Sequence, residues 1–413
     1  MAEMHDCVLM MAVRASFAFN GERFLPGGAT VIVRDGLVEG VESGGYEAPL
    51  DCPVTAYEGT LLPGLFDAHV HLVSDAALGG LERAGSLEAD AVDGIIERSL
   101  RQQAACGVTT VRDLGDVGYR TLAFRDSQRV GHPRIVAAGP PLTVPGGHCH
   151  YLGGTVDGPE AIRAMVTEHH QRGVDAIKVM ASGGITTVGT DPFGVQFERA
   201  DLRTLVEAAH AVGLPVIAHA HSLAGIRHAL VAGVDGIEHF TGLTESGIRV
   251  PDEVLAAVAQ AGVFVDPTLG FDRAVLASMP APPQRLLAAL KRIGLDLDTA
   301  QAARLQVLKR AQTHGIQVIT GVDAGAGPAK RHGIVALALA ALTEGGFSIA
   351  DAIASATAVA ARACGLAQVT GRLAPGLAAD LLVVDGNLEY DITALQRPLA
   401  VLIRGCPLDS RPD

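Results

Sequence analysis

The chain has 413 residues and a formal net charge of −13. This acidic balance, without any long run of Lys or Arg, lacks the electrostatic footprint of a nucleic-acid-binding protein, so we expect no nucleic-acid partner. Hydrophobic residues make up 48% of the chain, aromatic residues make up 4%, and tryptophan is absent. The interior must therefore be built from Ala, Val, Leu and Ile, which suits parallel strands covered by helices.

The two ends of the chain share one sequence texture. Residues 8–58 form short alternating runs punctuated by glycine, and the C-terminal stretch has the same pattern. Such runs predict small antiparallel sheets, and the simplest assembly joins residues 1–59 and 368–413 into one small β-sandwich domain. No stretch approaches the ~18 apolar residues of a membrane span, and the first apolar run is too short for a signal peptide. We expect a cytoplasmic protein without a membrane partner.

Between the two ends, short β-type runs alternate with helix-length amphipathic segments. Most of the helical segments open on Ser, Asp or Pro and close on Gly, as helix caps do. Eight strand-then-helix units indicate an α/β fold, a (β/α)8 TIM barrel over residues 60–367. The predicted strands lie within residues 61–71, 108–115, 134–142, 176–184, 214–221, 236–240, 263–269 and 317–325.

Polar residues gather where these strands end, which is the edge at which a TIM barrel carries its chemistry. The first strand ends with His69 and His71. Two residues apart in a strand, both imidazoles lie on one face and can reach one ion, although two exposed or hydrogen-bonded histidines give the same pattern. Further candidates at strand ends are Lys178, His219, His221, His239 and Asp323. Imidazole and carboxylate ligands without a C-x-x-C pair favour Zn²⁺, with Mn²⁺, Co²⁺ or Fe²⁺ as alternatives.

Lys178 lies in an apolar run that predicts a buried strand, although the chain has 28 arginines and only four lysines. An ammonium group has no lone pair for a metal. Burial lowers the pKa of a lysine, whereas an arginine stays protonated, so a lysine here can supply a neutral amine that CO₂ converts into a carbamate. The alternative is an ammonium group paired with a carboxylate near the strand end.

A glycine-flanked loop, GGHCHYLGG, follows the third predicted strand and carries His148, His150 and Tyr151. We expect these three side chains to face the pocket and bind substrate, since glycine permits the necessary turns. The alternative is that they cap the loop and hold the metal ligands. The role of Cys149, in the same loop, stays open.

Two long segments follow predicted strands and can reach the pocket. The Gly- and Thr-rich segment after Lys178 is placed to act as a lid. The segment after the seventh strand is expected to shape the specificity pocket, where Arg273 or Arg285 either meets a substrate carboxylate or is solvated at the surface.

Taken together, these residues resemble the amidohydrolase superfamily. The resemblance rests on DAHVH in the first strand, the strand-four lysine, the histidines of strands five and six, and the aspartate of TGVDAG. The segments GTLLPGLFDAHVH and GRLAPGLAADLLVVD are similar to those by which that family enters and leaves its barrel, so the resemblance covers nearly the whole chain. Within the superfamily, GGHCHYLGG and IKVMASGGITTVGTDP most resemble the imidazolonepropionase-like branch that contains Xaa-Pro dipeptidases (prolidases).

The resemblance implies a binuclear metal centre. The implied ligands are His69, His71 and Asp323 for one ion, and His219 and His239 for the other. Carboxylated Lys178 and a hydroxide would bridge the two ions, and Asp323 would take up the proton of the hydroxide and deliver it to the leaving amine. His221 stands where deaminases of the superfamily carry a glutamate, so we expect no deamination. We assign His221 a catalytic role in orienting substrate, with a hydrogen bond to a ligand as the alternative.

The predicted function is that of a metal-dependent amidohydrolase with two divalent ions, most simply Zn²⁺. A metal-bridging hydroxide would attack an amide or peptide bond of a small molecule such as an Xaa-Pro-like dipeptide or an N-acyl amino acid. The alternative is the same site acting on a cyclic amide, carbamate, lactone or phosphoester, because substrate choice lies in the loops. A non-enzymatic scaffold would have lost at least one ligand, and this sequence keeps them all. The family often forms homo-oligomers, and we expect one here.

Overall fold

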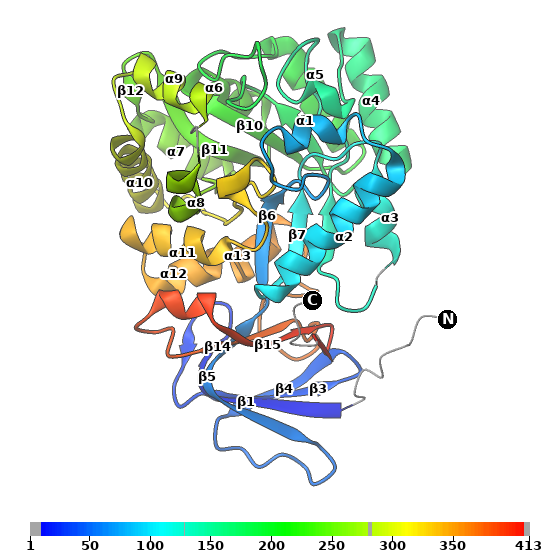
Figure 1. Cartoon of the computed structure of the whole chain (residues 1–413), viewed down its shortest axis with the longest axis vertical. Coiled ribbons are helices and arrows are strands. Elements are labelled where there is room, and N and C mark those ends of the chain that lie inside the picture. Colours follow the sequence, from blue (N-terminus) through cyan, green and yellow to red (C-terminus); the bar gives the residue numbers. More distant parts are fainter. Residues whose placement is uncertain (1–9, 128, 280–282, 409–413) are drawn as a thin grey trace.

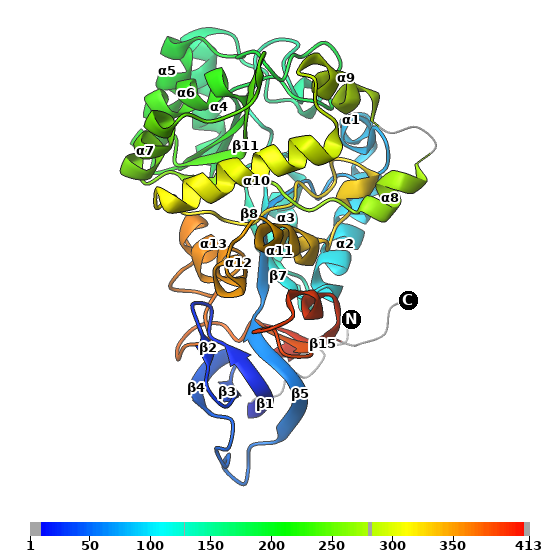
Figure 2. The same ribbon diagram turned by 90° about the vertical axis from the view of Figure 1, so that its left-hand side faces the viewer.

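Figure 1 shows the computed structural model, which describes residues 10–127, 129–279 and 283–408. A β-sheet lies at one end of the molecule, and strands surrounded by helices make up the rest (Figures 1 and 2). Across these ranges, no helix combines the length and the apolar character that crossing a membrane requires.

The sheet at one end combines strands from both ends of the chain. Its strands are β1 (Met10–Phe19), β2 (Phe24–Leu25), β3 (Ala29–Arg34), β4 (Leu37–Ser43), β5 (Val54–Pro63), β14 (Leu381–Asp385), β15 (Pro398–Ile403) and β16 (Cys406–Pro407). They lie in the order β16-β15-β14-β5-β1-β3-β4, with β2 paired to β1. Alternating Val and Leu residues form its apolar core. The limits of a composite domain and its β-sandwich form stay predictions.

The pairing in this sheet differs in one place from the expected antiparallel pattern. Strands β1 and β5 are parallel, because the β3–β4 hairpin is inserted between them in the sequence. That hairpin turns at Asp35 and Gly36, whose φ angles of 50° and 78° are those of a tight two-residue turn. Strand β5 then continues through Gly64 into the next strand, and a Cβ at Gly64 would lie 2.2 Å from the side chain of Thr109.

The central strands are parallel and buried. They are β6 (Leu65–Val70), β7 (Val108–Asp113), β8 (Arg134–Ala137), β9 (Ile177–Met180), β10 (Val216–Ser222), β11 (Gly236–Thr244) and β13 (Phe264–Asp266). Strands β6, β7 and β8 form one sheet, and β9, β10, β11 and β13 form another, with β12 (Gly247–Ile248) added antiparallel to β11. Every residue of β6, β7 and β9 is buried, as expected for parallel strands with both faces covered.

Residues 317–325, the last predicted strand, do not form a regular strand. Isolated parallel bridges nevertheless join Val318 to β13 and Ala324 to β6, and another joins residue 142 to β9. The irregularity has a local cause. The N–H of Val322 donates to the side chain of Asp67 at 3.0 Å instead of to a neighbouring backbone carbonyl, and Asp323 adopts a φ of 58°. This turn aims the carboxylate of Asp323 away from an ordinary strand direction.

Helices cover the central strands. They are α1 (Gly80–Ala84), α2 (Ala89–Ala105), α3 (Arg120–Ser127), α4 (Gly158–Arg172), α5 (Arg199–Ala211), α6 (Leu223–Ala232), α7 (Asp252–Ala261), α8 (Arg273–Ser278), α9 (Gln284–Arg292), α10 (Leu297–Thr313), α11 (Val335–Glu344), α12 (Ile349–Ser355) and α13 (Ala358–Ala363), with short 3₁₀ turns at His150–Leu152, Pro328–Lys330 and Ile392–Gln396. The expected caps are present on α6, where Ser222 accepts the N–H of Gly225 at 2.9 Å and Gly233 closes the helix at a φ of 89°.

Candidate metal centre

The first predicted ligand group lies where β6 ends. His69 is on the strand and His71 directly follows it, so both rings project from the same face, with centroids 5.3 Å apart. The Nε2 atoms of His69 and His71 lie 3.5 Å and 3.2 Å from Oδ1 of Asp323. These three side chains are close enough together to hold one cation.

The second predicted group lies on the neighbouring strands β10 and β11, which continue beyond His219 and His239. The ring centroids of His219 and His239 are 4.4 Å apart, and His221 stacks on His239 at 4.2 Å. The ring nitrogens of these three histidines also come close enough together for one ion. His221 therefore lies within this cluster, in contact with His239.

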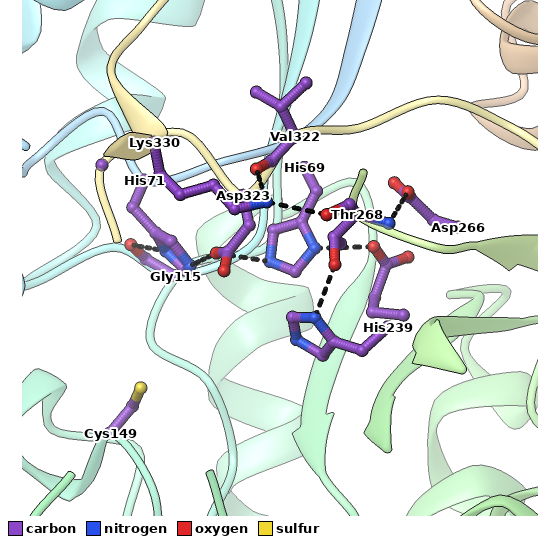
Figure 3. Close-up of polar contacts among 12 residues, drawn as sticks. His69, His71, Gly115, Cys149, His239, Asp266, Thr268, Val322, Asp323 and Lys330 are labelled. Atoms are coloured by element: carbon purple, nitrogen blue, oxygen red, sulfur yellow. Dashed lines mark hydrogen bonds and ion pairs between the residues drawn. The ribbon is translucent and has the colours of Figure 1, made fainter. Parts of the chain in front are cut away.

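In each of three predicted ligands, one ring nitrogen is hydrogen-bonded to the protein. The contacts are His71 Nδ1 to the carbonyl of Gly115 at 3.2 Å, His219 Nε2 to the carbonyl of Gly183 at 3.2 Å, and His239 Nδ1 to Oγ1 of Thr268 at 2.8 Å. Figure 3 shows the first and the last of these contacts. A hydrogen bond of this kind fixes the tautomer and the ring orientation. It leaves the opposite nitrogen of His219 and of His239 available for a metal, whereas the opposite nitrogen of His71 faces Asp323.

His69 is supported by a buried carboxylate on its other side. Glu238 places Oε2 2.7 Å from Nδ1 of His69, in close contact but without the alignment of a hydrogen bond. The other oxygen of Glu238 accepts a hydrogen bond of 2.9 Å from Arg112. Burial, followed by the charge of Lys178, lowers the pKa of His69 well below its ordinary value. The ring is therefore neutral and keeps a lone pair for a cation.

Asp323 remains ionised beside these rings. Burial alone would raise the pKa of its carboxyl, but the electrostatic interaction with His69 and the contact with Nε2 of His71 outweigh burial and hold the pKa below its ordinary value. On His71 the same hydrogen bond overcomes the effect of burial and raises the pKa. A carboxylate held in this way is ionised at neutral pH and can contribute to a cation site.

Lys178 is buried on β9, with 1% of its surface exposed. Burial lowers the pKa of its amine to about 8, although Glu238 and Asp323 act in the opposite direction. The Nζ atom has no hydrogen-bond partner in the described part of the chain. Among the described residues, Lys178 forms no ion pair that would support the alternative of an ammonium group paired with a carboxylate. The ring nitrogens and the carboxylate around it fit divalent cations.

The structure brings only part of the GGHCHYLGG loop to the cluster. The ring of His148 lies 4.6 Å from that of His219, between centroids, and Nδ1 of His148 is 2.8 Å from Oγ1 of Thr187. Tyr151 lines the same cavity. His150 is exposed, is hydrogen-bonded to the backbone of its own loop, and is not among the described residues that line the cavity.

Cys149 also lies on the cavity wall and is buried. Burial raises the pKa of its thiol to about 12. The Sγ atom is 3.6 Å from Nε2 of His148 and 3.7 Å from the hydroxyl of Tyr151. A thiol whose pKa is raised in this way stays protonated at neutral pH, which disfavours a role as a nucleophile.

The two histidine clusters and Lys178 open into one cavity of about 990 Å³. This volume is at the upper end for small-molecule sites. Many of the apolar residues that line the cavity come from α8, α9 and their flanking loops; they include Leu276, Met279, Leu286, Leu290 and Phe271. The site is therefore large enough for a substrate much bulkier than a dipeptide of small residues.

The two arginines that the sequence offered for a substrate carboxylate are engaged elsewhere. Arg285 donates to the carbonyls of Ile185 and Thr190 at 2.8 Å and 2.9 Å, which ties α9 to the segment after β9. Arg273 is exposed and pairs with Asp298 at 3.4 Å.

Several residues of the site were not predicted from the sequence. They are Arg112, Glu238, Thr268, Arg304 and Lys330. Figure 3 shows Lys330 reaching the backbone beside Asp323 and at Thr268. Glu238 could have been predicted from the sequence, because it is a carboxylate inside an otherwise apolar strand and next to a predicted ligand.

Comparison with known proteins agrees with this geometry. The amidohydrolase family matches residues 60–406. The ochratoxinase of Aspergillus niger is 29% identical over 370 residues, covering 83% of this chain and 73% of that protein. A putative prolidase from Bifidobacterium longum is similar in structure, with a TM-score of 0.77, 28% identity, and coverage of 97% of this chain and 95% of that one.

A solved Xaa-Pro dipeptidase with methionine in its active site has a TM-score of 0.84 at 24% identity, covering 97% of this chain and 100% of that one. This likeness implies a TIM-barrel-type α/β fold. The expected resemblance to prolidases is thereby confirmed. The chain belongs to the amidohydrolase family and is a hydrolase that acts on carbon–nitrogen bonds.

Proposed function

We propose that this protein is a binuclear metal-dependent amidohydrolase that cleaves the amide bond of an N-acyl amino acid or an Xaa-Pro-like dipeptide. The observation that carries the proposal is the presence, on one cavity wall, of two groups of metal-competent side chains together with the buried and unpartnered amine of Lys178. The alternative substrates, a cyclic amide, carbamate, lactone or phosphoester, would use the same wall, and a substrate panel separates them.

The proposed ligands divide as the clusters do. His69, His71 and Asp323 would hold one ion, and His219 and His239 the other. Nitrogen and carboxylate donors favour Zn²⁺. Lys178 would join the two ions as a carbamate, because an amine with a pKa near 8 has a neutral fraction that can add CO₂. Divalent ions at such a site lower the pKa of bound water and polarise a carbonyl oxygen.

The protein's own groups supply the remaining chemistry. Asp323 would accept a proton from the attacking water and pass it to the leaving amine, since its carboxylate stays ionised between the two histidines. Burial lowers the pKa of His221 to about 3, so its ring is neutral. Its Nδ1 lies 2.9 Å from Oγ1 of Thr241, which leaves Nε2 to orient the substrate. His148 and Tyr151 would contact the substrate from the loop, and His150 has no place in this arrangement.

The proposal extends to the fold. The two central sheets and the isolated bridges follow one another in an order that supports an eight-stranded closed barrel, with residues 60–367 as the catalytic part and residues 1–59 and 368–413 as a composite β-domain. The cytoplasmic location and the homo-oligomer stay predictions from the sequence.

The test is elemental analysis of protein purified without chelators, with hydrolysis of a panel of Xaa-Pro dipeptides and N-acyl amino acids on the same sample. We expect about two metal ions per chain, the number in a two-metal site, and a marked loss of metal in Lys178→Ala. Lys309→Ala is the matched control, because Lys309 is exposed on α10. Unchanged metal content in Lys178→Ala would mean that Lys178 has a structural role and binds no metal. Cleavage of esters or phosphoesters without cleavage of amides would contradict the proposed amide substrate.

A further inference from the structure

One cationic side chain in the cavity has no role in the proposed mechanism. Arg304, in the middle of α10, lines the cavity together with Gln301 one turn earlier. Its guanidinium donates to the backbone carbonyl of Pro267, at the end of β13. Among the described residues, Arg304 forms no ion pair with a carboxylate, whereas Arg273 and Arg285 on the same cavity wall are committed to Asp298 and to loop carbonyls.

The charge of Arg304 is not compensated by its surroundings. Burial lowers its pKa to about 10, so it remains protonated at neutral pH. Asp266 is the carboxyl group that acts on it, but burial and the charge of Glu238 raise the pKa of Asp266 well above its ordinary value. Arg304 is partly buried, and its one described hydrogen bond goes to a neutral carbonyl. A cation in such a place lacks a counter-charge, which a bound anion would supply.

Arg304 is also close to the predicted chemistry. After burial, its charge is the largest influence that lowers the pKa of His221, and Pro267 directly precedes Thr268, which holds the ring of His239. A group bound by Arg304 therefore lies beside the second histidine cluster. The apolar wall of α8 and α9 lines the same cavity.

We propose that Arg304 binds the free carboxylate of the substrate, and that the substrate class is an N-acyl amino acid with a bulky apolar acyl group or side chain. This inference rests on the proposed amide hydrolysis and names the substrate of that site. A guanidinium suits the task because it presents a planar pair of donors to a carboxylate. The carboxylate at Arg304 would orient the scissile amide toward the clusters, and the apolar remainder would lie against α8 and α9.

The experiment compares two compounds that differ in one group, N-benzoyl-L-leucine and N-benzoyl-3-methylbutylamine, which lacks the carboxylate. Both are assayed with the metal-loaded wild type, Arg304→Met and Arg203→Met. We expect Arg304→Met to lower kcat/KM for N-benzoyl-L-leucine by about 10- to 100-fold, the range for a charged hydrogen bond. The same variant should leave kcat/KM for N-benzoyl-3-methylbutylamine nearly unchanged. Arg203→Met should change neither, because Arg203 is exposed on α5 and does not line the cavity. Arg304→Lys should recover part of the loss.

The ratio between the two compounds is measured on the same protein, so partial misfolding cannot imitate the expected result. Equal losses for both compounds, or no loss for the acid, would overturn the inference and leave the amidohydrolase proposal standing. Calorimetric binding of N-benzoyl-L-leucine separates the two ideas in the other direction. Binding that requires Arg304, without cleavage of any amide, would support the carboxylate site and refute the proposed reaction.

Discussion

Glu238→Gln tests whether the carboxylate behind His69 tunes the metal site. The substitution removes one charge and keeps the size of the side chain. Glu238 accepts from Arg112 at 2.9 Å and lies 2.7 Å from His69, and all three side chains are buried. Losing a partner behind a metal-binding histidine costs about 10- to 100-fold in metal affinity, equivalent to about 1.4–2.8 kcal/mol. Losing a charged hydrogen bond lowers the free energy of unfolding by about 1.5–3 kcal/mol.

Metal affinity is measured by competition with a chromophoric chelator, and unfolding of the metal-free protein is followed in urea. Glu97→Gln is the matched control, since Glu97 pairs with Arg129 at 3.0 Å and with His132, and none of the three lines the cavity. We expect only Glu238→Gln to release metal at lower chelator concentration. A metal affinity equal to that of the wild type, in a variant that is folded and less stable, would refute the coupling and reduce Glu238 to a partner of Arg112.

Three further substitutions probe the loop, a buried acid and the strand ends. Gly184→Ala should lower turnover, because its Cβ would lie 2.2 Å from the ring of His148, whereas Gly194→Ala meets nothing nearer than 3.6 Å and should leave turnover unchanged. Burial raises the pKa of Asp116 to about 7. The folded state therefore keeps a proton that the unfolded chain releases above about pH 4, so wild-type stability falls by up to about 1.4 kcal/mol per pH unit toward neutrality, and Asp116→Asn should remove this slope. Lys330→Met should lower the free energy of unfolding by about 1–3 kcal/mol, because Nζ donates to two buried carbonyls at 2.7 Å and 2.8 Å.

Steady-state kinetics checks the glycine variants, and urea unfolding at a series of pH values checks the other two. Equal turnover in Gly184→Ala and Gly194→Ala would contradict the close packing of the loop on His148. Parallel stability profiles of the wild type and Asp116→Asn would mean that Asp116 is ionised in the folded protein. Unchanged unfolding of Lys330→Met would show that water satisfies the carbonyls equally well.

The positions of the predicted ligands could be inferred because neighbouring parallel strands carry equivalent residues to the same edge of the sheet. A histidine at the end of β6, β10 or β11 must face the same rim, so spacing along the chain was enough to group His69, His71, His219 and His239. Asp323 was predicted from its place after the last apolar run, although that run is irregular. Its neighbour Val322 gives up a strand hydrogen bond to Asp67, and such an exchange depends on tertiary contacts that no local pattern encodes.

Two other residues, His150 and Arg304, were not placed correctly from the sequence. His150 was expected in the pocket because it shares a motif with His148, but the positive φ of Cys149, 57°, separates the directions of the two neighbouring side chains. Arg304 was missed although a signal existed. It lies four residues after Ala300 and three before Val307, both buried on α10, so helical spacing places it on the inner stripe of that helix.

The charges around the cavity suggest why the histidine clusters and Arg304 occur in one site. Burial lowers the pKa of His219 and His239 well below the ordinary value, so the clusters present neutral donors that attract cations. Arg304 carries an unpaired positive charge near the same rim and attracts an anion. A substrate that bears a carboxylate near its amide satisfies both demands in one orientation. Charged groups and bulky groups would then be recognised by different elements, because Arg304 lies on α10 whereas the apolar lining residues lie on α8 and α9. Changes in those two helices should therefore reorder the preferred acyl groups without altering the requirement for a carboxylate.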